Sequence, residues 1–225
     1  MYSPAMEFEN RWHSLLRTTS EDVKRLTAVW RYSSIPVAVQ ENVAEHSFWV
    51  ALYAVMIARK LGADRDVQGQ VALEGLIHDL PECVTGDVVR PFKYSSQEFK
   101  QAVDLAEGDM VDTLPDAIRE MLADSDEVRS EYVKAIVKAA DFLSLFQYMR
   151  REAARGNLEI IPFYMKMVED LGAIWRSSPK DVPMPQPADN FRPGPFYMAL
   201  RNEALAVAKD CFHGLEEDPR WMRKV

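Results

Sequence analysis

The sequence has few cysteines and no long apolar run. Two cysteines, Cys83 and Cys211, are too few for a disulfide framework and favour a reducing compartment. The longest apolar run, Phe48 to Ala58, is too short to cross a bilayer, and residues 1–14 show no apolar signal-peptide core. We therefore expect a soluble, cytoplasmic protein with no membrane partner.

The chain also has no excess of positive charge. It carries 27 Lys and Arg against 35 Asp and Glu, a formal net charge of -8. Nonspecific nucleic-acid binding through bulk positive charge is therefore not expected, although a local basic pocket can still accept an anionic substrate. The hydrophobic share of 48% is ample for a buried core and excludes a disordered chain.

The third absence is strand alternation, since apolar residues recur at helical spacing throughout. The fold prediction is all-α, one domain of about seven or eight helices. Residues 1–176 form the core, and residues 177–225 a proline-rich loop plus a C-terminal helix packed on it. The expected helices cover 21–31, 44–61, a segment capped by Asp66 and running to His78, 99–114, 116–122, a long helix ending at Arg155, 158–175 and 196–212.

Three motifs within the expected helices contain histidine and aspartate, the residue types that bind metal ions. His78-Asp79 ends an apolar helix, His46 begins another on its inward face, and Asp141 lies on the buried stripe of the long helix. Two imidazoles and two carboxylates from separate segments predict one divalent metal ion with nitrogen and oxygen ligands. Glu82 and Asp87, in the loop after His78, would then be free for proton transfer.

Ordinary structural roles compete with this interpretation. An isolated inward histidine such as His46 is more often a core residue with a backbone partner. A buried carboxylate at Asp141 is costly unless it is paired, for example with an arginine, or bound to a metal. Ligation is favoured because the other three residues need a fourth partner. The only other histidines, His13 and His213, lie outside the motifs, so a single metal is favoured over two.

Together these motifs identify a family. The order His46, His78-Asp79, Asp141 resembles the HD-domain metal-dependent phosphohydrolases, closest to the bacterial 5'-deoxynucleotidases. The resemblance runs from about Arg31 to Asn157. It implies an HD-domain helical bundle, and its specific parts are Glu41 to Ser47, His78 to Asp87, Pro91 to Tyr94 and Lys138 to Asp141.

The resemblance also assigns roles. It implies that His46, His78, Asp79 and Asp141 hold the metal, that Glu82 is the catalytic glutamate and that Asp87 is a second active-site carboxylate. Substrate-binding positions are also implied: Arg31 at the phosphate, Tyr32 at the sugar and Lys93 near the substrate. Tyr32 replaces a tryptophan of the bacterial enzymes, which leaves open how strictly 2'-deoxyribose is preferred.

The expected activity is release of phosphate from (deoxy)nucleoside 5'-monophosphates, with one Mn, Co, Zn or Mg ion. Glu82 could activate the water and Asp87 protonate the leaving group, or the roles could be reversed. A deoxynucleoside triphosphate triphosphohydrolase is the alternative, with Arg90, Arg150 and Arg151 as candidate phosphate contacts. A non-catalytic nucleotide-binding protein is a third reading, disfavoured by Glu82 and Asp87. The resemblance and the surplus of apolar helix surface predict a homodimer.

Overall fold

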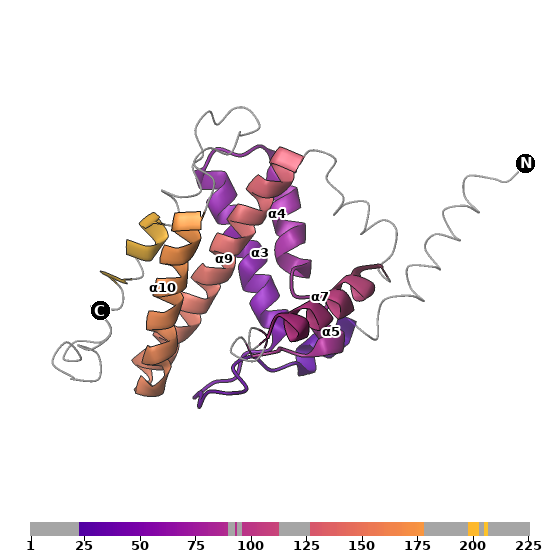
Figure 1. The fold of residues 1–225 in the computed structure, drawn as a ribbon. Coiled ribbons are helices and arrows are strands. Elements are labelled where there is room, and N and C mark those ends of the chain that lie inside the picture. The colour runs from indigo at the N-terminus through magenta and orange to yellow at the C-terminus, as the bar shows by residue number, and fades with distance from the viewer. Residues whose placement is uncertain are drawn as a thin grey trace, which may run out of the picture.

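The structure, a computed structural model, describes residues 23–89, 93, 96–112, 127–177, 198–202 and 205–206. Within these residues it is helical, and the bridge between Trp30 and Asn42 is the one isolated β-bridge. The predicted all-α fold is therefore confirmed (Figure 1). The elements are η1 (Arg25–Ala28), α3 (Val43–Lys60), α4 (Arg65–Ile77), α5 (Glu82–Thr85), α7 (Gln97–Asp112), α9 (Glu127–Ala154), η2 (Leu158–Ile160) and α10 (Ile161–Ser177).

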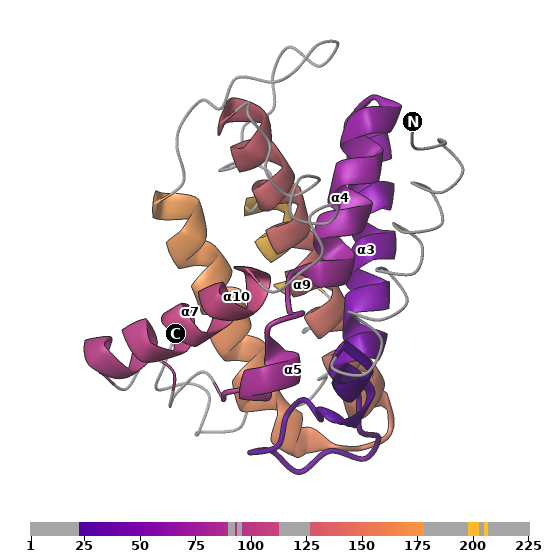
Figure 2. The same cartoon turned by 90° about the vertical axis from the view of Figure 1, so that its right-hand side faces the viewer.

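The helices α3, α4 and α9 form the centre of the molecule (Figures 1 and 2). Their contact is an apolar cluster that includes Val50, Val71 and Ile136, each at most 1% exposed. A second cluster joins α9 to η2 and α10, and a smaller one joins η1, the start of α3 and the α5 region. The chain thus packs three segments, those containing His46, His78 and Asp141, around one core.

Helix α3 begins and ends where the sequence predicts, within one residue. Asn42 caps it, because its Oδ1 accepts the Glu45 N–H at 3.0 Å and the Glu45 carboxylate accepts the Asn42 N–H in return. Gly62, with φ of 77°, follows the last turn in the left-handed conformation. This register places His46 in the first turn with 0% of its surface exposed.

Helix α4 is predicted correctly in extent, but its cap is not Asp66. Asp64 is the N-cap, and its Oδ1 accepts the Val67 N–H at 2.8 Å, which puts Asp66 inside the first turn. At the other end His78 is the C-cap, with its N–H bonded to Glu74 O at 2.8 Å. His78 and Asp79 therefore lie where the helix ends and the chain turns toward α5.

The predicted helix over 21–31 is too long within the described residues. The 3-10 helix ends at Ala28, and Val29 is extended because its carbonyl accepts the Val43 N–H at 3.0 Å. Arg31 N–H likewise donates to Glu41 O at 2.9 Å. Pairing with the residues before α3 outcompetes continuation of the helix, so Arg31 lies on extended chain and is not a helix C-terminal cation.

The later helices follow the prediction closely. Ser96 caps α7 through the Phe99 N–H, and Gly156, with φ of 83°, follows the end of α9. The predicted helix 116–122 and most of the proline-rich loop lie outside the described residues. Residues 198–202 and 205–206 are helical, and Leu200 and Leu205 pack against the α9–α10 cluster. The division at residue 176 stays a prediction.

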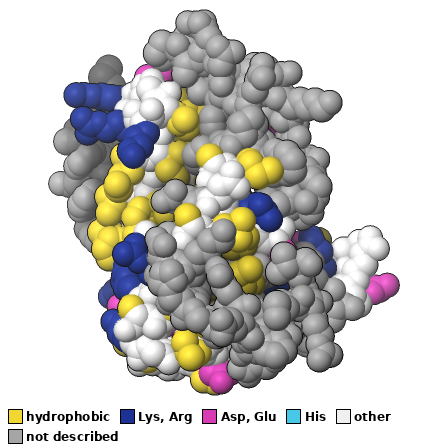
Figure 3. All heavy atoms as spheres, turned by 90° about the vertical axis from the view of Figure 1, so that its left-hand side faces the viewer, with side chains coloured by type: hydrophobic (Ala, Val, Ile, Leu, Met, Phe, Trp, Pro, Cys, Tyr) yellow, Lys and Arg dark blue, Asp and Glu magenta, His cyan; other side chains and the backbone are white. Residues whose placement is uncertain are grey.

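The surface is not uniformly acidic. On the face that includes α10, Lys and Arg side chains are more prominent than Asp and Glu among the described residues, and hydrophobic side chains lie between them (Figure 3). In the described part of the chain no helix has the length and apolar content needed to span a membrane.

The crossing of α3 and α4 depends on a glycine. A Cβ on Gly75 would lie 2.6 Å from Ala51 Cα and 2.8 Å from Ala51 N, which is too close for a methyl group. We predict that Gly75→Ala lowers the free energy of unfolding by roughly 1–3 kcal/mol. Gly69→Ala, in the same helix with nothing within 4 Å, should instead raise it by about 0.5–1 kcal/mol. Urea denaturation of the metal-free proteins measures both, and equal stability of the two variants would contradict this packing.

Candidate functional site

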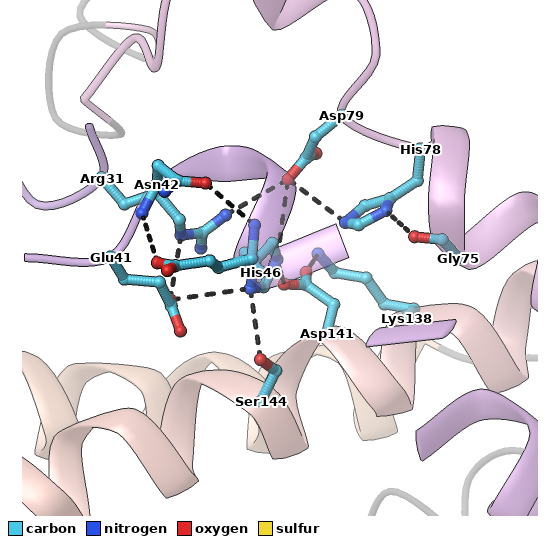
Figure 4. A network of polar contacts seen from close by, with 11 residues as sticks. Arg31, Glu41, Asn42, His46, Gly75, His78, Asp79, Lys138, Asp141 and Ser144 are labelled. Carbon is cyan, nitrogen blue, oxygen red and sulfur yellow. Dashed lines mark hydrogen bonds and ion pairs between the residues drawn. The ribbon is translucent and has the colours of Figure 1, made fainter. Parts of the chain in front are cut away.

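Four predicted ligand residues converge where α3, α4 and α9 meet. His46 comes from the first turn of α3, His78 and Asp79 from the end of α4, and Asp141 from the middle of α9. Asp79 lies between Arg31, His46 and His78, and Asp141 approaches the same ring nitrogen of His46, Nε2, as Asp79 does (Figure 4). The structure thus brings together residues that are up to 95 positions apart in the sequence.

The spacing of these atoms suits one metal ion. His46 Nε2 lies 3.3 Å from Asp141 Oδ1 and 3.6 Å from Asp79 Oδ2, and His78 Nε2 lies 3.2 Å from Asp79 Oδ2. Two ligands bound at about 2.1 Å to one ion are about 3.0–3.4 Å apart at octahedral or tetrahedral angles. One ligand atom each from His46, His78 and Asp79 lies within 4.8 Å of the others.

The opposite ring nitrogens favour the same arrangement. His78 Nδ1 donates to Gly75 O at 2.9 Å, so in the neutral ring the lone pair lies on Nε2. Burial lowers the pKa of His78, but Asp79 outweighs the burial and raises that pKa above its usual value, so a metal ion would compete with a proton for Nε2. His46 Nδ1 lies 3.2 Å from Ser144 Oγ and 3.9 Å from Glu41 Oε2. Both Nε2 atoms are buried, and within the part of the chain that the structure describes neither has a hydrogen-bond partner. A divalent ion bound between these two imidazole nitrogens and the neighbouring carboxylate oxygens would give both nitrogens a partner.

The electrostatics of the cluster are strongly coupled. Burial lowers the pKa of His46 to about 4, so its ring is neutral at pH 7, as a metal ligand must be. Burial alone would raise the pKa of Asp79, but His78 and Arg31 hold it well below its usual value. Burial acts likewise on Asp141, whose pKa Lys138 and His46 hold low. Both carboxylates are therefore ionised at neutral pH.

The predicted phosphate contact, Arg31, lies beside these carboxylates. Its Nη1 is 3.2 Å from Asp79 Oδ2 and its Nε is 3.7 Å from Glu41 Oε2. No arginine among the described residues forms an ion pair with Asp141; Lys138 Nζ lies 2.7 Å from Asp141 Oδ2. A guanidinium therefore lies within the cluster, next to the residues that would hold the ion.

Tyr32 lies next to Arg31 in an uncommon conformation. Its φ of 61° is left-handed, which is rare for a residue with a large side chain. The ring stacks on Tyr148 of α9 with 4.3 Å between centroids and 13° between planes, and the Arg31 guanidinium lies 5.3 Å from its centroid. Both Tyr148 and the Arg31 guanidinium thus contact the Tyr32 ring.

The two predicted acid–base residues follow Asp79 directly. Glu82 is the first residue of α5, and its N–H donates to Asp79 O at 3.0 Å, so a tight turn places its backbone next to that of Asp79. Burial raises the pKa of Asp87, an effect that Arg31 opposes, and the Tyr32 backbone hydrogen-bonds to the carboxylate. Asp87 therefore lies within the influence of Arg31 and Asp79.

Lys93, which was predicted to lie near the substrate, contacts helix α7 in the structure. An ion pair joins its Nζ to Asp104 Oδ1 of α7 at 4.0 Å. Its predicted position near the substrate stays a prediction.

Sequence reasoning assigned no role to Glu41 or Ser144. Glu41 shares the motif of His46 and lies between Arg31 and the His46 ring, with 8% of its surface exposed. Ser144 follows Asp141 by three residues on the buried face of α9, and its hydroxyl meets His46. The signals available in the sequence were a glutamate within the motif of His46 and a polar residue one turn after Asp141.

Comparison with known proteins agrees with this geometry. A family model described as "5'-deoxynucleotidase YfbR-like" matches residues 20–181, most of the chain. The chain belongs to the YfbR-like 5'-deoxynucleotidase family. A 5'-deoxynucleotidase of Citrobacter koseri is 33% identical over 149 residues, and 5'-deoxynucleotidase YfbR of Escherichia coli is 32% identical over the same length. Each match covers 62% of this chain and 74% of the relative.

Solved structures show the same fold. An HD-domain phosphohydrolase from Listeria innocua is similar with a TM-score of 0.56 and 21% identity, covering 88% of each chain. The cyanophage S-2L HD phosphohydrolase DatZ, bound to dA and one catalytic Zn²⁺ ion, is similar with a TM-score of 0.53 and 16% identity. That match covers 87% of this chain and 97% of DatZ. The predicted HD-domain bundle is confirmed, and the family is one of enzymes.

The buried Glu41 makes stability depend on pH. Burial raises its pKa from 4.5 to about 7, so the folded protein keeps a proton that the unfolded chain releases. This contribution to stability is complete below pH 4.5 and is lost as the pH rises through 7. Glu41→Gln is always neutral, so its stability relative to the metal-free parent should improve by about 2 kcal/mol between pH 5 and pH 7.

Urea denaturation at the two pH values measures this difference. The control is Glu131→Gln on the exposed face of α9, which should show no such change. A Glu41→Gln effect that is equal at pH 5 and pH 7 would contradict the assigned environment of Glu41.

Proposed function

We propose that this protein releases inorganic phosphate from 2'-deoxynucleoside 5'-monophosphates with one divalent metal ion. The observation that carries the proposal is the pair of buried, unsatisfied Nε2 atoms of His46 and His78, 3.2–3.6 Å from carboxylate oxygens and next to Arg31. Family membership supports the substrate class, since relatives over most of the matched region are named 5'-deoxynucleotidases.

In this proposal His46, His78, Asp79 and Asp141 hold the ion. A bound divalent ion supplies polarisation of the phosphoryl group and a lowered pKa of bound water. Gly75 fixes the His78 tautomer through its carbonyl, and Ser144 and Glu41 orient the His46 ring. Mixed nitrogen and oxygen ligands accommodate Mn, Co, Zn or Mg, so the native metal is left to the assay.

The remaining residues of the cluster bind the phosphate and move protons. The Arg31 guanidinium offers a planar fork for phosphate oxygens and is already held beside the cluster by Asp79 and Glu41. Glu82, in the turn after Asp79, would orient or deprotonate the attacking water. Asp87, whose pKa burial raises, would hold a proton for the departing O5' of the nucleoside.

Tyr32 and Lys93 are assigned to the substrate's periphery. The ring face of Tyr32 not covered by Tyr148 would pack against C2' of the sugar and disfavour a ribose hydroxyl. Lys93, paired with Asp104 on α7, would approach the substrate only if that helix lines the site.

Two alternative functions are less well supported. A triphosphohydrolase would need further cations at the site, but Arg151 lies over the Trp49 ring at 5.6 Å, Arg150 is exposed, and Arg90 lies outside the described residues. A non-catalytic nucleotide-binding protein would not need Glu82 and Asp87 beside the metal ligands.

We also propose a homodimer in the cytoplasm. Phe48, Leu52 and Met56 are exposed at intervals of four residues along α3, and Leu76 is exposed on the neighbouring α4. An apolar stripe of this kind suits a symmetric interface between two copies. Two cysteines, too few for a disulfide framework, are compatible with a reducing compartment.

The direct test of function is phosphate release from a panel of nucleoside mono-, di- and triphosphates, each as deoxyribo- and ribonucleotide, with Mn, Co, Zn or Mg. The proposal expects monophosphates to be hydrolysed with the highest kcat/KM and deoxyribonucleotides to be preferred. Release of tripolyphosphate from a triphosphate, with no turnover of monophosphates, would replace it.

Glu82→Gln separates chemistry from binding. The amide keeps the size of the side chain but accepts no proton, so kcat should fall by roughly 10²–10⁴ while metal content and nucleotide affinity are kept. Steady-state kinetics, elemental analysis and calorimetry check these three quantities, with Glu159→Gln on exposed η2 as the control. Turnover within about threefold of the parent would make Glu82 structural, and loss of metal would make it a ligand.

A further inference from the structure

The segment that carries Arg31 and Tyr32 is a closed loop. Its two ends pair through the bridge between Trp30 and Asn42 and the bond from Arg31 N to Glu41 O at 2.9 Å. The proposed phosphate and sugar contacts lie at one end of this loop, and Glu41, which faces His46, lies at the other. The ends alone do not fix how the residues between them are placed.

The middle of the loop is held by the last turns of α9. Glu152 is 0% exposed, and its carboxylate accepts the N–H of Ala38 at 2.6 Å and of Val39 at 3.1 Å. Tyr148 donates its hydroxyl to Val39 O at 2.6 Å. Asn157 donates one amide group both to Glu152, at 2.8 Å, and to Pro36 O, at 2.9 Å.

These contacts come from the same face of α9 as the metal-site residues. Asp141, Ser144, Tyr148 and Glu152 are three or four residues apart, so they lie along one side of the helix. Asp141 would hold the ion and Ser144 contacts the His46 ring. Further along the helix, Tyr148 stacks on Tyr32 and Glu152 binds the loop backbone. One rigid helix thus sets the distance between the metal position and the loop that carries Arg31.

A buried carboxylate is costly unless it is fully hydrogen-bonded, and here backbone N–H groups of the loop supply those bonds. Ala38 and Val39 are themselves exposed, so the coupling comes from the glutamate, whose buried carboxylate would lose these bonds if the Ala38–Val39 backbone moved. The position of the loop and the burial of Glu152 are therefore coupled.

We propose that Glu152 is a positioning residue for substrate binding. It holds the Ala38–Val39 backbone so that Arg31 and Tyr32 meet the phosphate and sugar at the correct distance from the metal. This inference rests on the proposed function and adds a residue outside the cluster to it.

Glu152→Gln tests the proposal, because an amide cannot accept at both positions and its NH₂ would face a backbone donor. The Kd for dAMP and the KM should rise about tenfold, kcat should change less than threefold, and metal content should be unchanged. Glu131→Gln, the same change on the exposed face of α9, is the matched control and should leave all four quantities at parent values.

A double-mutant cycle separates positioning from loss of stability. In the Arg31→Ala background, Glu152→Gln should change the Kd for dAMP by about threefold or less, because one of the two residues it positions is gone. An equal tenfold change in both backgrounds, or a lower Tm with unchanged Kd and KM, would overturn the proposal. Tyr148→Phe, which removes only the bond to Val39 O, should raise Kd in the same direction and serves if Glu152→Gln does not fold.

The proposed function can fail independently of this inference. If the parent hydrolyses no monophosphate, phosphohydrolysis is wrong, while calorimetric binding of dAMP still reports the role of Glu152. If the parent hydrolyses dAMP and Glu152→Gln binds it normally, only the positioning role is wrong.

Discussion

The arrangement depends on the charge of Asp79. This carboxylate lies 3.2 Å from both His78 and Arg31 and 3.6 Å from His46, so residues from three segments meet at one oxygen. A buried carboxylate needs such partners, and its low pKa shows that they outweigh the burial. Placing a divalent ion there would satisfy the two Nε2 atoms and leave Arg31 available to a phosphate.

The helices explain why the cluster holds its shape. Helix α3 presents His46 from a capped first turn, and the close crossing permitted by Gly75 brings the end of α4 beside it. Helix α9 supplies Asp141 and also supports the neighbouring loop through Tyr148 and Glu152. In the proposed function, metal binding and substrate binding would therefore both depend on this helix.

Much of this could be predicted from the sequence, because helical periodicity and residue type carry the information. The inward faces of His46 and Asp141 follow from the apolar stripes around them, and the structure brings both together with His78 and Asp79. The early end of the N-terminal helix was not predictable, because local propensity does not include the backbone pairing of Val29 with Val43. The cap at Asp64 was missed because Asp64 and Asp66 are both suitable N-cap residues close to the helix start.

The environment of Glu41 and the role of Glu152 escaped prediction for a related reason. Both are glutamates in polar stretches, where charged residues are usually solvated, and only the tertiary fold buries them. Glu152 lies 113 and 114 residues from the two N–H groups it binds, so no local pattern connects them. Long-range pairing of loop and helix is the part of the site that sequence periodicity does not encode.

The most direct test is the metal content of the purified protein after removal of metal and reloading with Mn, Co or Zn. The account predicts one equivalent for the parent, one for the control Asp104→Ala on α7, and well under one for His78→Ala and Asp141→Ala. A full equivalent retained by His78→Ala would contradict the assignment of the His–Asp cluster as the metal centre.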